Sequence, residues 1–306
     1  MQKEQIQTLI DTCPFPGACG SPELIETHIS WVILTDQYAF KIKKPLKLSF
    51  LDYSTLEKRE HFCNEELVLN RRLWPEIKQG VILITAGMTG LNGQEDSGKV
   101  VDYAVQMKKL DPQKQMHLLL EKNQVTTAHL DRLTGKLARF HKNARIIKNA
   151  FDTTGFQEKF EDIRTVMDDV VKMLGGEWEE RINRVVERSN FYLNSSRNLF
   201  NQRIITNFRR NCHGDLNATN IFLYDDPVIF DCTEFNKEFR HIDVLNEIAF
   251  LSVDLDFYGN PGLSDHFFRS YLEAYGMDED DNLRRMYSYY KCYRANIRAK
   301  VTAINS

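Results

Sequence analysis

The stretch NCHGDLNATNIFLYDDPVIFDCTEF, residues 211–235, carries polar residues at offsets that packing alone does not explain. A His-Gly-Asp triplet ends at Asp215, an asparagine follows five residues later at Asn220, and Asp231 closes the apolar run PVIF. Taken singly, Asp215 and Asn220 fit loop capping, because both residue types favour turns. Asp231 taken singly fits a strand-end turn. The joint spacing of the three residues instead favours a functional site.

This spacing matches what phosphoryl transfer from a nucleotide requires. Oxygen ligands must hold the magnesium ions that bridge the phosphates, and a carboxylate must take the proton of the acceptor hydroxyl. The offset resembles the kinase catalytic loop, in which an aspartate orients the acceptor and an asparagine reaches a metal ion. We therefore predict Asp215 as the base and Asn220 and Asp231 as magnesium ligands. His213 is expected to be a structural hydrogen-bonding residue.

Composition and charge narrow the class of protein. The chain has 306 residues, of which 42% are hydrophobic and 27% charged, as in an ordinary globular protein. Its formal net charge of -3 gives no indication of a nucleic-acid or anionic-membrane partner. No apolar run reaches the ~20 residues that span a bilayer, and the first residues lack the pattern of a secretory signal. We expect a cytoplasmic protein without a nucleic-acid or membrane partner.

The pattern changes along the chain from strands to helices. The first third contains one expected helix, at 54–74, and four expected strands, at 31–35, 38–43, 80–85 and 99–110. Beyond Pro112 the pattern is mostly helical, apart from a short strand-turn-strand within 221–230. We predict an α+β, bilobal chain: a strand-rich lobe with one main helix over 1–109 and a larger, mostly helical lobe over 110–306. The crevice between two such lobes is the expected ligand site.

The first lobe offers a cation for the phosphates. In YAFKIKK, residues 38–44, Lys41 and Lys43 point to the same face of a strand because side chains alternate. On the following helix, Glu66 falls in the middle of the apolar face. A buried carboxylate requires a charged partner, and we predict Lys41 as that partner. The alternative is an ordinary exposed lysine on an edge strand.

The stretches HGDLNATN and IFDCTEF together resemble the aminoglycoside phosphotransferase superfamily, which has a protein-kinase-like fold. The strand YAFK and the inward Glu66 resemble the lysine and the C-helix glutamate of that fold. Residues 27–59 and 239–259 are similar to an uncharacterised bacterial subgroup, the aminoglycoside phosphotransferase family enzymes. The resemblance covers most of the chain and is weakest from about 150 to 205.

The resemblance implies a function and a set of roles. Asp215 would be the catalytic base, Asn220 and Asp231 the magnesium ligands, and Lys41 a phosphate-binding lysine paired with Glu66. ATP and Mg²⁺ would be the cofactors, and a hydroxyl of a small molecule would accept the γ-phosphoryl group.

The resemblance also implies a hinge that binds adenine through its backbone, at about Gln106, Met107 and Lys108. Asp243 resembles the aspartate that braces the catalytic loop. Alternatively, it is an ordinary acid at a helix N-terminus, stabilised by the helix dipole.

The chain departs from the family pattern in three places. The sequence THIS, residues 27–30, stands where a glycine-rich phosphate loop is expected, so Thr27 and Ser30 are candidates to replace it. Asn217 occupies a position where many relatives have histidine. Relatives of the subgroup often carry a fused P-loop kinase domain, but no GxxxxGK[ST] sequence occurs here, so any activity is expected from the kinase-like part.

Two alternatives to a small-molecule phosphotransferase remain. One is a catalytically weak or inactive nucleotide-binding regulatory module of the same fold, which the missing glycine loop would suit. The other is a protein kinase, which is disfavoured because no activation segment ending in Ala-Pro-Glu follows Asp231. In the last expected helix, Arg294 and Arg298 either meet an anionic substrate group or pair with an acid of the second lobe.

Overall fold

Two compact units make up the chain. The computed structural model describes residues 1–13, 15–75, 80–86 and 99–304. The first unit comprises Met1–Gln115 together with Asn220–Tyr224 and Val228–Lys237, and the remaining described residues form the second. The first division falls after Gln115, and the lobe boundary expected at 109/110 stays a prediction. The segment that carries Asn220 and Asp231 belongs with the strands of the first unit, because its hairpin packs there.

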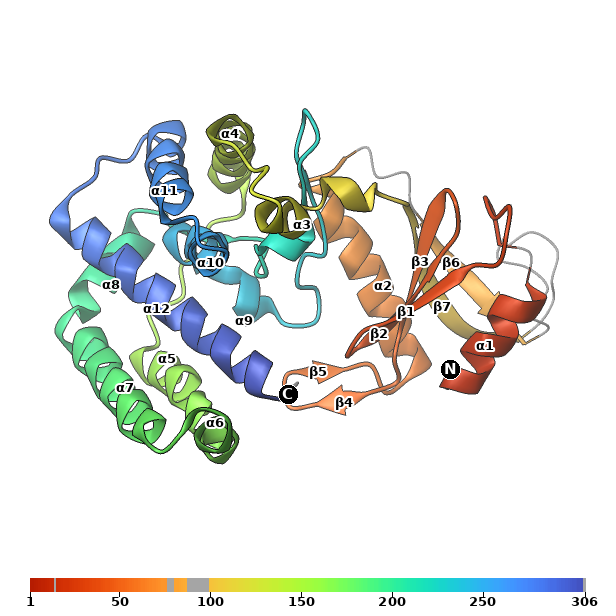
Figure 1. Cartoon of the computed structure of the whole chain (residues 1–306), viewed down its shortest axis with the longest axis horizontal. Coiled ribbons are helices and arrows are strands. Elements are labelled where there is room, and N and C mark those ends of the chain that lie inside the picture. The colour runs from red at the N-terminus through yellow and green to blue at the C-terminus, as the bar shows by residue number, and fades with distance from the viewer. Residues whose placement is uncertain (14, 76–79, 87–98, 305–306) are drawn as a thin grey trace. The chain divides into compact units, whose positions relative to one another are not determined.

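A five-stranded antiparallel sheet is the framework of the first unit (Figure 1). Its order is β1-β2-β3-β7-β6, and the bounds are β1 Glu23–Glu26, β2 Ser30–Leu34, β3 Tyr38–Lys43, β6 Gly80–Thr85 and β7 Val100–Lys108. The expected hairpin is β2 and β3, in which Ile33 lies opposite Phe40. A two-stranded hairpin follows, with β4 at Lys47–Leu48 and β5 at Leu51–Asp52. The expected turn-rich connection at 87–98 lies outside the described residues.

Helix α1, Lys3–Thr12, covers one face of this sheet (Figure 1). It was not among the elements expected for the first third of the chain. Ile6 and Leu9 are fully buried on it and belong to one apolar cluster with Ile33 and Phe40 of the sheet. This cluster is the main core of the first unit.

Helix α2, Leu56–Arg71, covers the opposite face. Its Cys63 packs with Val105 of β7. Because Phe40 of β3 points toward α1, alternation along the strand turns Lys41 and Lys43 toward α2. The two lysines therefore lie on the face that receives the helix.

The ends of α2 follow from local sequence. Its N-cap Thr55 accepts a hydrogen bond from the backbone N–H of Lys58 through the side-chain hydroxyl, which satisfies an otherwise free donor. The helix stops at Arg71, a few residues before Pro75, because a residue preceding proline disfavours helical geometry.

A later segment of the chain forms a second short hairpin that belongs to the first unit. Its strands are β9, Ile221–Phe222, and β10, Val228–Ile229, which pair antiparallel. Phe222 and Val228 pack with Trp74, which follows α2. The short strand-turn-strand expected within 221–230 is therefore present.

The second unit is mostly helical, as expected. Its helices are α3 Met116–Glu121, α4 Thr127–Asn143, α5 Thr153–Glu161, α6 Met167–Leu174, α7 Glu177–Ser195, α8 Arg197–Ile205, α10 Val244–Phe257, α11 Pro261–Tyr275 and α12 Asp281–Ile304. A short β8, Arg209–Asn211, pairs with β11, His241–Asp243, and the four-residue α9, Lys237–Arg240, precedes β11. Helix α10 is buried along nearly its whole length and packs against α11 and α12. Within the described ranges, no helix has the length and apolar character needed to cross a membrane.

Candidate functional site

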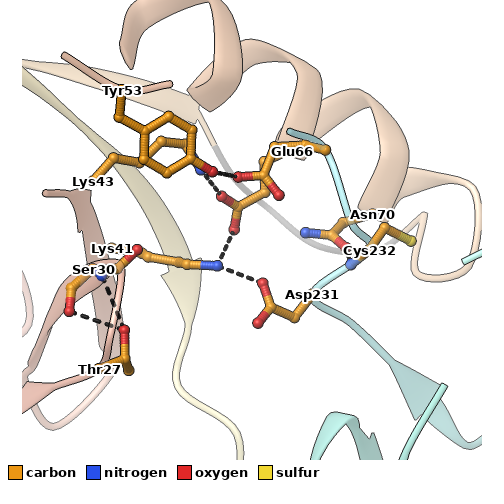
Figure 2. A network of polar contacts seen from close by, with 10 residues as sticks. Thr27, Ser30, Lys41, Lys43, Tyr53, Glu66, Asn70, Asp231 and Cys232 are labelled. Carbon is orange, nitrogen blue, oxygen red and sulfur yellow. Dashed lines mark hydrogen bonds and ion pairs between the residues drawn. The ribbon is translucent and has the colours of Figure 1, made fainter. Parts of the chain in front are cut away.

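Lys41 of β3 and Glu66 of α2 form an ion pair, with 3.1 Å between Lys41 Nζ and Glu66 Oε1 (Figure 2). The strand turns Lys41 toward the helix, and the helix turns Glu66 inward, where 1% of its side chain is exposed. The contact expected between these two residues is therefore present. The role of Lys41 toward a phosphate stays a prediction.

Neighbouring charges affect the pKa values of this pair more than burial does. Burial opposes ionisation of Glu66, but the ammonium groups of Lys41 and Lys43 lower the pKa of its carboxyl group to about 2. Burial also opposes the charge of Lys41, but the carboxylates of Asp231 and Glu66 raise its pKa. Glu66 and Lys41 are therefore both ionised at neutral pH. A charged lysine is held in place on the sheet.

Asp231 is the second partner of Lys41 and accepts a hydrogen bond from its ammonium group (Figure 2). Its side chain is 37% exposed, compared with 11% for Lys41. Its backbone φ is +64°, a left-handed value that residues other than glycine seldom adopt. The next N–H, of Cys232, donates to Asn70 Oδ1 of α2 at 2.9 Å. The fold thus holds Asp231 in an unfavourable backbone conformation with its carboxylate accessible, a combination found at functional sites.

A second ion pair lies deeper in the first unit. Lys43 Nζ lies 2.6 Å from Glu66 Oε2 and also bonds to Glu234. The hydroxyl of Tyr53 donates to the same Glu234 carboxylate, and the Tyr53 ring centre lies 4.9 Å from Lys43 Nζ. Sequence reasoning assigned no role to Lys43, Glu234 or Tyr53. The available signal was the strand alternation, since a second inward lysine requires a second carboxylate.

The hairpin of β9 and β10 brings Asn220 close to Asp231 along the backbone. The carbonyl of Asn220 accepts a hydrogen bond of 3.1 Å from the N–H of Phe230, the residue before Asp231. Asn220 is itself buried. The side chains of the two predicted metal ligands therefore branch from neighbouring stretches of backbone.

The donor set at these positions suits magnesium bound together with a nucleotide. Among the residues that the structure describes, no group of three His, Cys, Asp or Glu side chains could hold a metal ion. Magnesium at nucleotide sites takes one or two protein carboxylates and completes its shell with phosphate and water oxygens. The accessible carboxylate of Asp231 and the amide oxygen of Asn220 are hard oxygen donors of this kind. These residues fit a shared metal site and do not form a cage made by protein alone.

Asp215 lies in a loop of the second unit whose main chain is held by α10. The fully buried carboxylate of Glu247 accepts hydrogen bonds from the N–H groups of His213, at 2.8 Å, and Gly214, at 3.1 Å. Gly214 has φ +94°, which explains a glycine at this position. His213 Nδ1 accepts a hydrogen bond of 3.2 Å from the N–H of Asp215. His213 thus makes the kind of structural hydrogen bond that was expected.

The other end of this loop is held by the same helix. Asp254 lies seven residues after Glu247, which places both acids on one face of α10. Its Oδ2 accepts a hydrogen bond of 2.7 Å from the N–H of Ala218, and its Oδ1 pairs with Arg298. Burial raises the pKa of Asp254, although Arg298 and the Ala218 N–H act in the opposite direction. Glu247 and Asp254 therefore fix the loop on both sides of Asp215.

Asp243 has the second of the two roles considered for it. Its Oδ1 accepts a hydrogen bond of 2.8 Å from the N–H of Leu245, so it caps α10. Arg203 donates to both carboxylate oxygens at 2.7 Å. The loop that carries Asp215 is braced by Glu247 and Asp254.

The two arginines of α12 both contact α10. Arg298 makes the ion pair with an acid that was expected, through Asp254. Arg294 instead donates from Nε to the side-chain oxygen of Asn246 at 2.7 Å and to its carbonyl at 3.2 Å. Its guanidinium also lies 4.9 Å from the ring centre of Phe250. Both arginines are thus engaged with α10.

Ser30 is buried at the start of β2. Thr27 closes the preceding turn, because its hydroxyl accepts from the N–H of Ser30 and donates to the Ser30 carbonyl, each at 3.0 Å (Figure 2). Within the described part of the chain, the Ser30 hydroxyl is buried without a hydrogen-bond partner. Ser30 pairs with Lys43 across the sheet, so its side chain shares the face of the two lysines. A contact between Ser30 and a nucleotide stays a prediction.

The predicted hinge residues form the end of β7. Gln106, Met107 and Lys108 lie opposite Phe40, Ala39 and Tyr38 of β3. The N–H of Lys109 continues this pairing with a hydrogen bond of 2.8 Å to the carbonyl of Gln37. Their binding of adenine stays a prediction.

The predicted site residues fall in both units. Lys41, Glu66, Asn220 and Asp231 belong to the first unit, where ion pairs and the β9–β10 hairpin bring them together. Asp215 belongs to the second unit. Its meeting with the other residues stays a prediction.

Sequence comparison finds uncharacterised relatives. The uncharacterized protein Rv2004c of Mycobacterium tuberculosis and the uncharacterized protein Mb2027c of Mycobacterium bovis are each 31% identical to this chain over 304 residues. The match covers 96% of this chain and 57% of each relative, so the chain spans a little over half of their length. No family model matches the sequence.

Structural comparison identifies the fold. A choline/ethanolamine kinase family protein from Mesorhizobium loti matches with a TM-score of 0.53 at 14% identity, covering 99% of this chain and 85% of that one. The GDP and kanamycin complex of APH(2'')-IIia matches with a TM-score of 0.52 at 17% identity, covering 96% and 90%. Aminoglycoside phosphotransferase APH(3'')-Id from Streptomyces rimosus, in complex with ADP and streptomycin, matches with a TM-score of 0.50 at 14% identity, covering 96% and 99%. The chain therefore has the kinase-like fold that these structures share.

Proposed function

We propose that this chain is an ATP- and Mg²⁺-dependent phosphotransferase that moves the γ-phosphoryl group to a hydroxyl of a small molecule. The observation that carries the proposal is Lys41, which is held between Glu66 and the accessible Asp231 in the first unit. An inward lysine fixed by a helix carboxylate, next to an acid that can hold a metal ion, is the arrangement that binds and orients nucleotide phosphates.

Each predicted site residue of the first unit has a defined task in this proposal. Lys41 binds the phosphates and remains oriented by Glu66, which also keeps the lysine charged. Asp231 and Asn220 hold magnesium, which neutralises charge on the phosphates when it is bound. The backbone at Gln106–Lys108 receives the adenine.

Asp215, which lies in the second unit, is the general base of the reaction. Its carboxylate accepts the proton of the acceptor hydroxyl while the hydroxyl oxygen forms a bond to the γ-phosphorus. The bond between that phosphorus and the oxygen bridging to the β-phosphate breaks, and ADP leaves with the bond's electron pair. Because Glu247 and Asp254 hold the main chain of the loop, the backbone that carries Asp215 is fixed before the reaction.

The class of acceptor is supported by the structural neighbours. These include a choline/ethanolamine kinase family protein and phosphotransferases in complex with kanamycin or streptomycin. They support a hydroxyl on a small polar molecule as the acceptor. A cytoplasmic location, where ATP is available, is part of the same proposal.

Metal-dependent nucleotide binding tests the proposal without knowledge of the acceptor. We expect the melting temperature to rise when ATP and Mg²⁺ are added together, and to rise little with ATP plus EDTA or with Mg²⁺ alone. A ligand at 100 times its Kd adds about 2.7 kcal/mol to the free energy of unfolding, which a thermal-shift measurement detects easily.

A matched pair of lysine variants controls this measurement. Lys41→Met is expected to lose the stabilisation by Mg·ATP. Lys58→Met is expected to retain it, because Lys58 is an exposed residue of α2 that pairs with Asp52. A rise in melting temperature with ATP that depends neither on magnesium nor on Lys41 would favour a non-catalytic binding module. No rise with ATP under any condition would refute the proposal.

A further inference from the structure

Two ion pairs join the strand β3 to the segment 231–235. Lys41 bonds to Asp231 at its start, and Lys43 bonds to Glu234 three residues later. We refer to Lys41–Asp231 as the outer pair and to Lys43–Glu234 as the inner pair. The two lysines point the same way from one strand, so the pairs lie side by side and fix the register of the segment against β3.

The outer pair is accessible through Asp231, whose side chain is 37% exposed, and the inner pair is closed. The side chains of Lys43 and Glu234 are 1% and 4% exposed, so the inner pair is shielded almost completely. Tyr53 completes its surroundings, since its hydroxyl donates to Glu234 and its ring covers the Lys43 ammonium group. A ligand that arrives at this site therefore reaches the outer pair only.

Glu66 links the two pairs through its two carboxylate oxygens. Oε1 lies 3.1 Å from Lys41 Nζ, and Oε2 lies 2.6 Å from Lys43 Nζ (Figure 2). Because Lys43 holds one oxygen, the carboxylate cannot rotate freely, and the other oxygen stays directed at Lys41. The inner pair thus fixes both the segment that carries Asp231 and the carboxylate that orients Lys41.

Nucleotide binding would separate the outer pair. Under the proposed function, Lys41 turns to the phosphates and Asp231 to magnesium, so their mutual bond is lost. The inner pair would still join the segment to β3, and Cys232 would still bond to Asn70 and Leu69 of α2.

We propose that Lys43, Glu234 and Tyr53 are positioning residues that keep the 231–235 segment and Glu66 in place while Asp231 and Lys41 engage metal and phosphate. This inference rests on the proposed function. It predicts that loss of the inner pair weakens magnesium binding about 10–100-fold, which is the usual effect of removing groups that orient metal ligands.

A purely structural ion pair is the competing explanation, and a double variant separates the two. Removing one partner of a buried pair strands the other charge and destabilises the protein. Removing both partners in favour of apolar residues is often neutral or stabilising, so Lys43→Met/Glu234→Leu is expected to fold. If the role is structural, the double variant recovers both the stability and the magnesium binding that the single variants lose. If the role is positioning, it recovers the stability but not the magnesium binding.

Two readouts decide the question in the double variant. The first is hydrogen exchange of the Cys232 amide in the nucleotide-free protein, because this N–H reports on the segment through its bond to Asn70. The second is the Mg²⁺ concentration that gives half-maximal ATP binding. We expect faster exchange than in the wild type and a half-saturation raised about 10–100-fold. Lys58→Met serves as the control with unchanged values, since Lys58 is exposed, pairs with Asp52 and lies outside the two pairs.

The outcomes separate this inference from the proposed function. Wild-type exchange and wild-type magnesium dependence in the double variant would overturn the inference. A wild-type protein without magnesium-dependent ATP binding would overturn the proposed function, and the exchange of Cys232 would still show whether the inner pair holds the segment.

Discussion

Replacement of Asp215 by asparagine is expected to lower kcat about 10²–10⁴-fold, the usual contribution of a general base. Asparagine has nearly the same shape but cannot accept the proton of the acceptor hydroxyl. The loop is expected to stay in place, because Glu247 and Asp254 hold its main chain on both sides of residue 215. The dissociation constant for Mg·ATP is therefore expected to change little.

The measurement is transfer of labelled γ-phosphate from ATP to a panel of sugars, amino alcohols, amino acids and aminoglycosides. Asp225→Asn is the matched control, since Asp225 is an exposed acid in the turn between β9 and β10. Full transfer by Asp215→Asn would show that the base is assigned wrongly. Absence of transfer by the wild-type protein on the whole panel, with Mg·ATP still bound, would favour the regulatory module.

Replacement of Asp231 by asparagine is expected to abolish most of the stabilisation by Mg·ATP. An amide oxygen carries no charge, and magnesium prefers carboxylate ligands. We expect the Mg²⁺ concentration for half-maximal ATP binding to rise at least about 100-fold, because removing a direct ligand costs no less than disturbing the groups that orient it. Asparagine tolerates the left-handed backbone of this position, so the substitution adds little strain.

The nucleotide-free Asp231→Asn protein is expected to melt within a few degrees of the wild type. Asp231 is 37% exposed, and the buried Lys41 keeps its ion pair with Glu66, so the substitution leaves no buried charge without a partner. Asp226→Asn is the control, because Asp226 pairs with Lys136 at the surface. Unchanged magnesium dependence in Asp231→Asn would remove this residue from the metal site.

Local periodicity was sufficient to predict much of the first unit. The alternation of apolar residues gave the β2–β3 hairpin and placed Lys41 and Lys43 on one face, and the helical period gave an inward Glu66. These predictions depend on residues a few positions apart, where backbone geometry fixes the direction of each side chain. The same reasoning indicated that the short hairpin within 221–230 would form.

Contacts between residues far apart in the sequence could not be predicted from local periodicity. The inner pair joins positions 43 and 234, and no local pattern indicates which carboxylate a buried lysine will meet. Arg294 likewise binds the neutral Asn246 and not an acid. The loop brace could have been found, because Glu247 and Asp254 lie within an otherwise apolar helix and must have partners there. The sequence resemblance pointed instead to Asp243, which caps that helix.

A crystal structure of the full chain with a non-hydrolysable ATP analogue and Mn²⁺ tests the central claim most directly. Manganese takes the same oxygen ligands as magnesium and can be located by its anomalous scattering. We predict one metal peak about 2.1 Å from oxygens of Asp231 and Asn220, with Lys41 on the phosphates and Asp215 facing the γ-phosphate. A nucleotide bound elsewhere, with Lys41 still bonded to Asp231, would contradict the account.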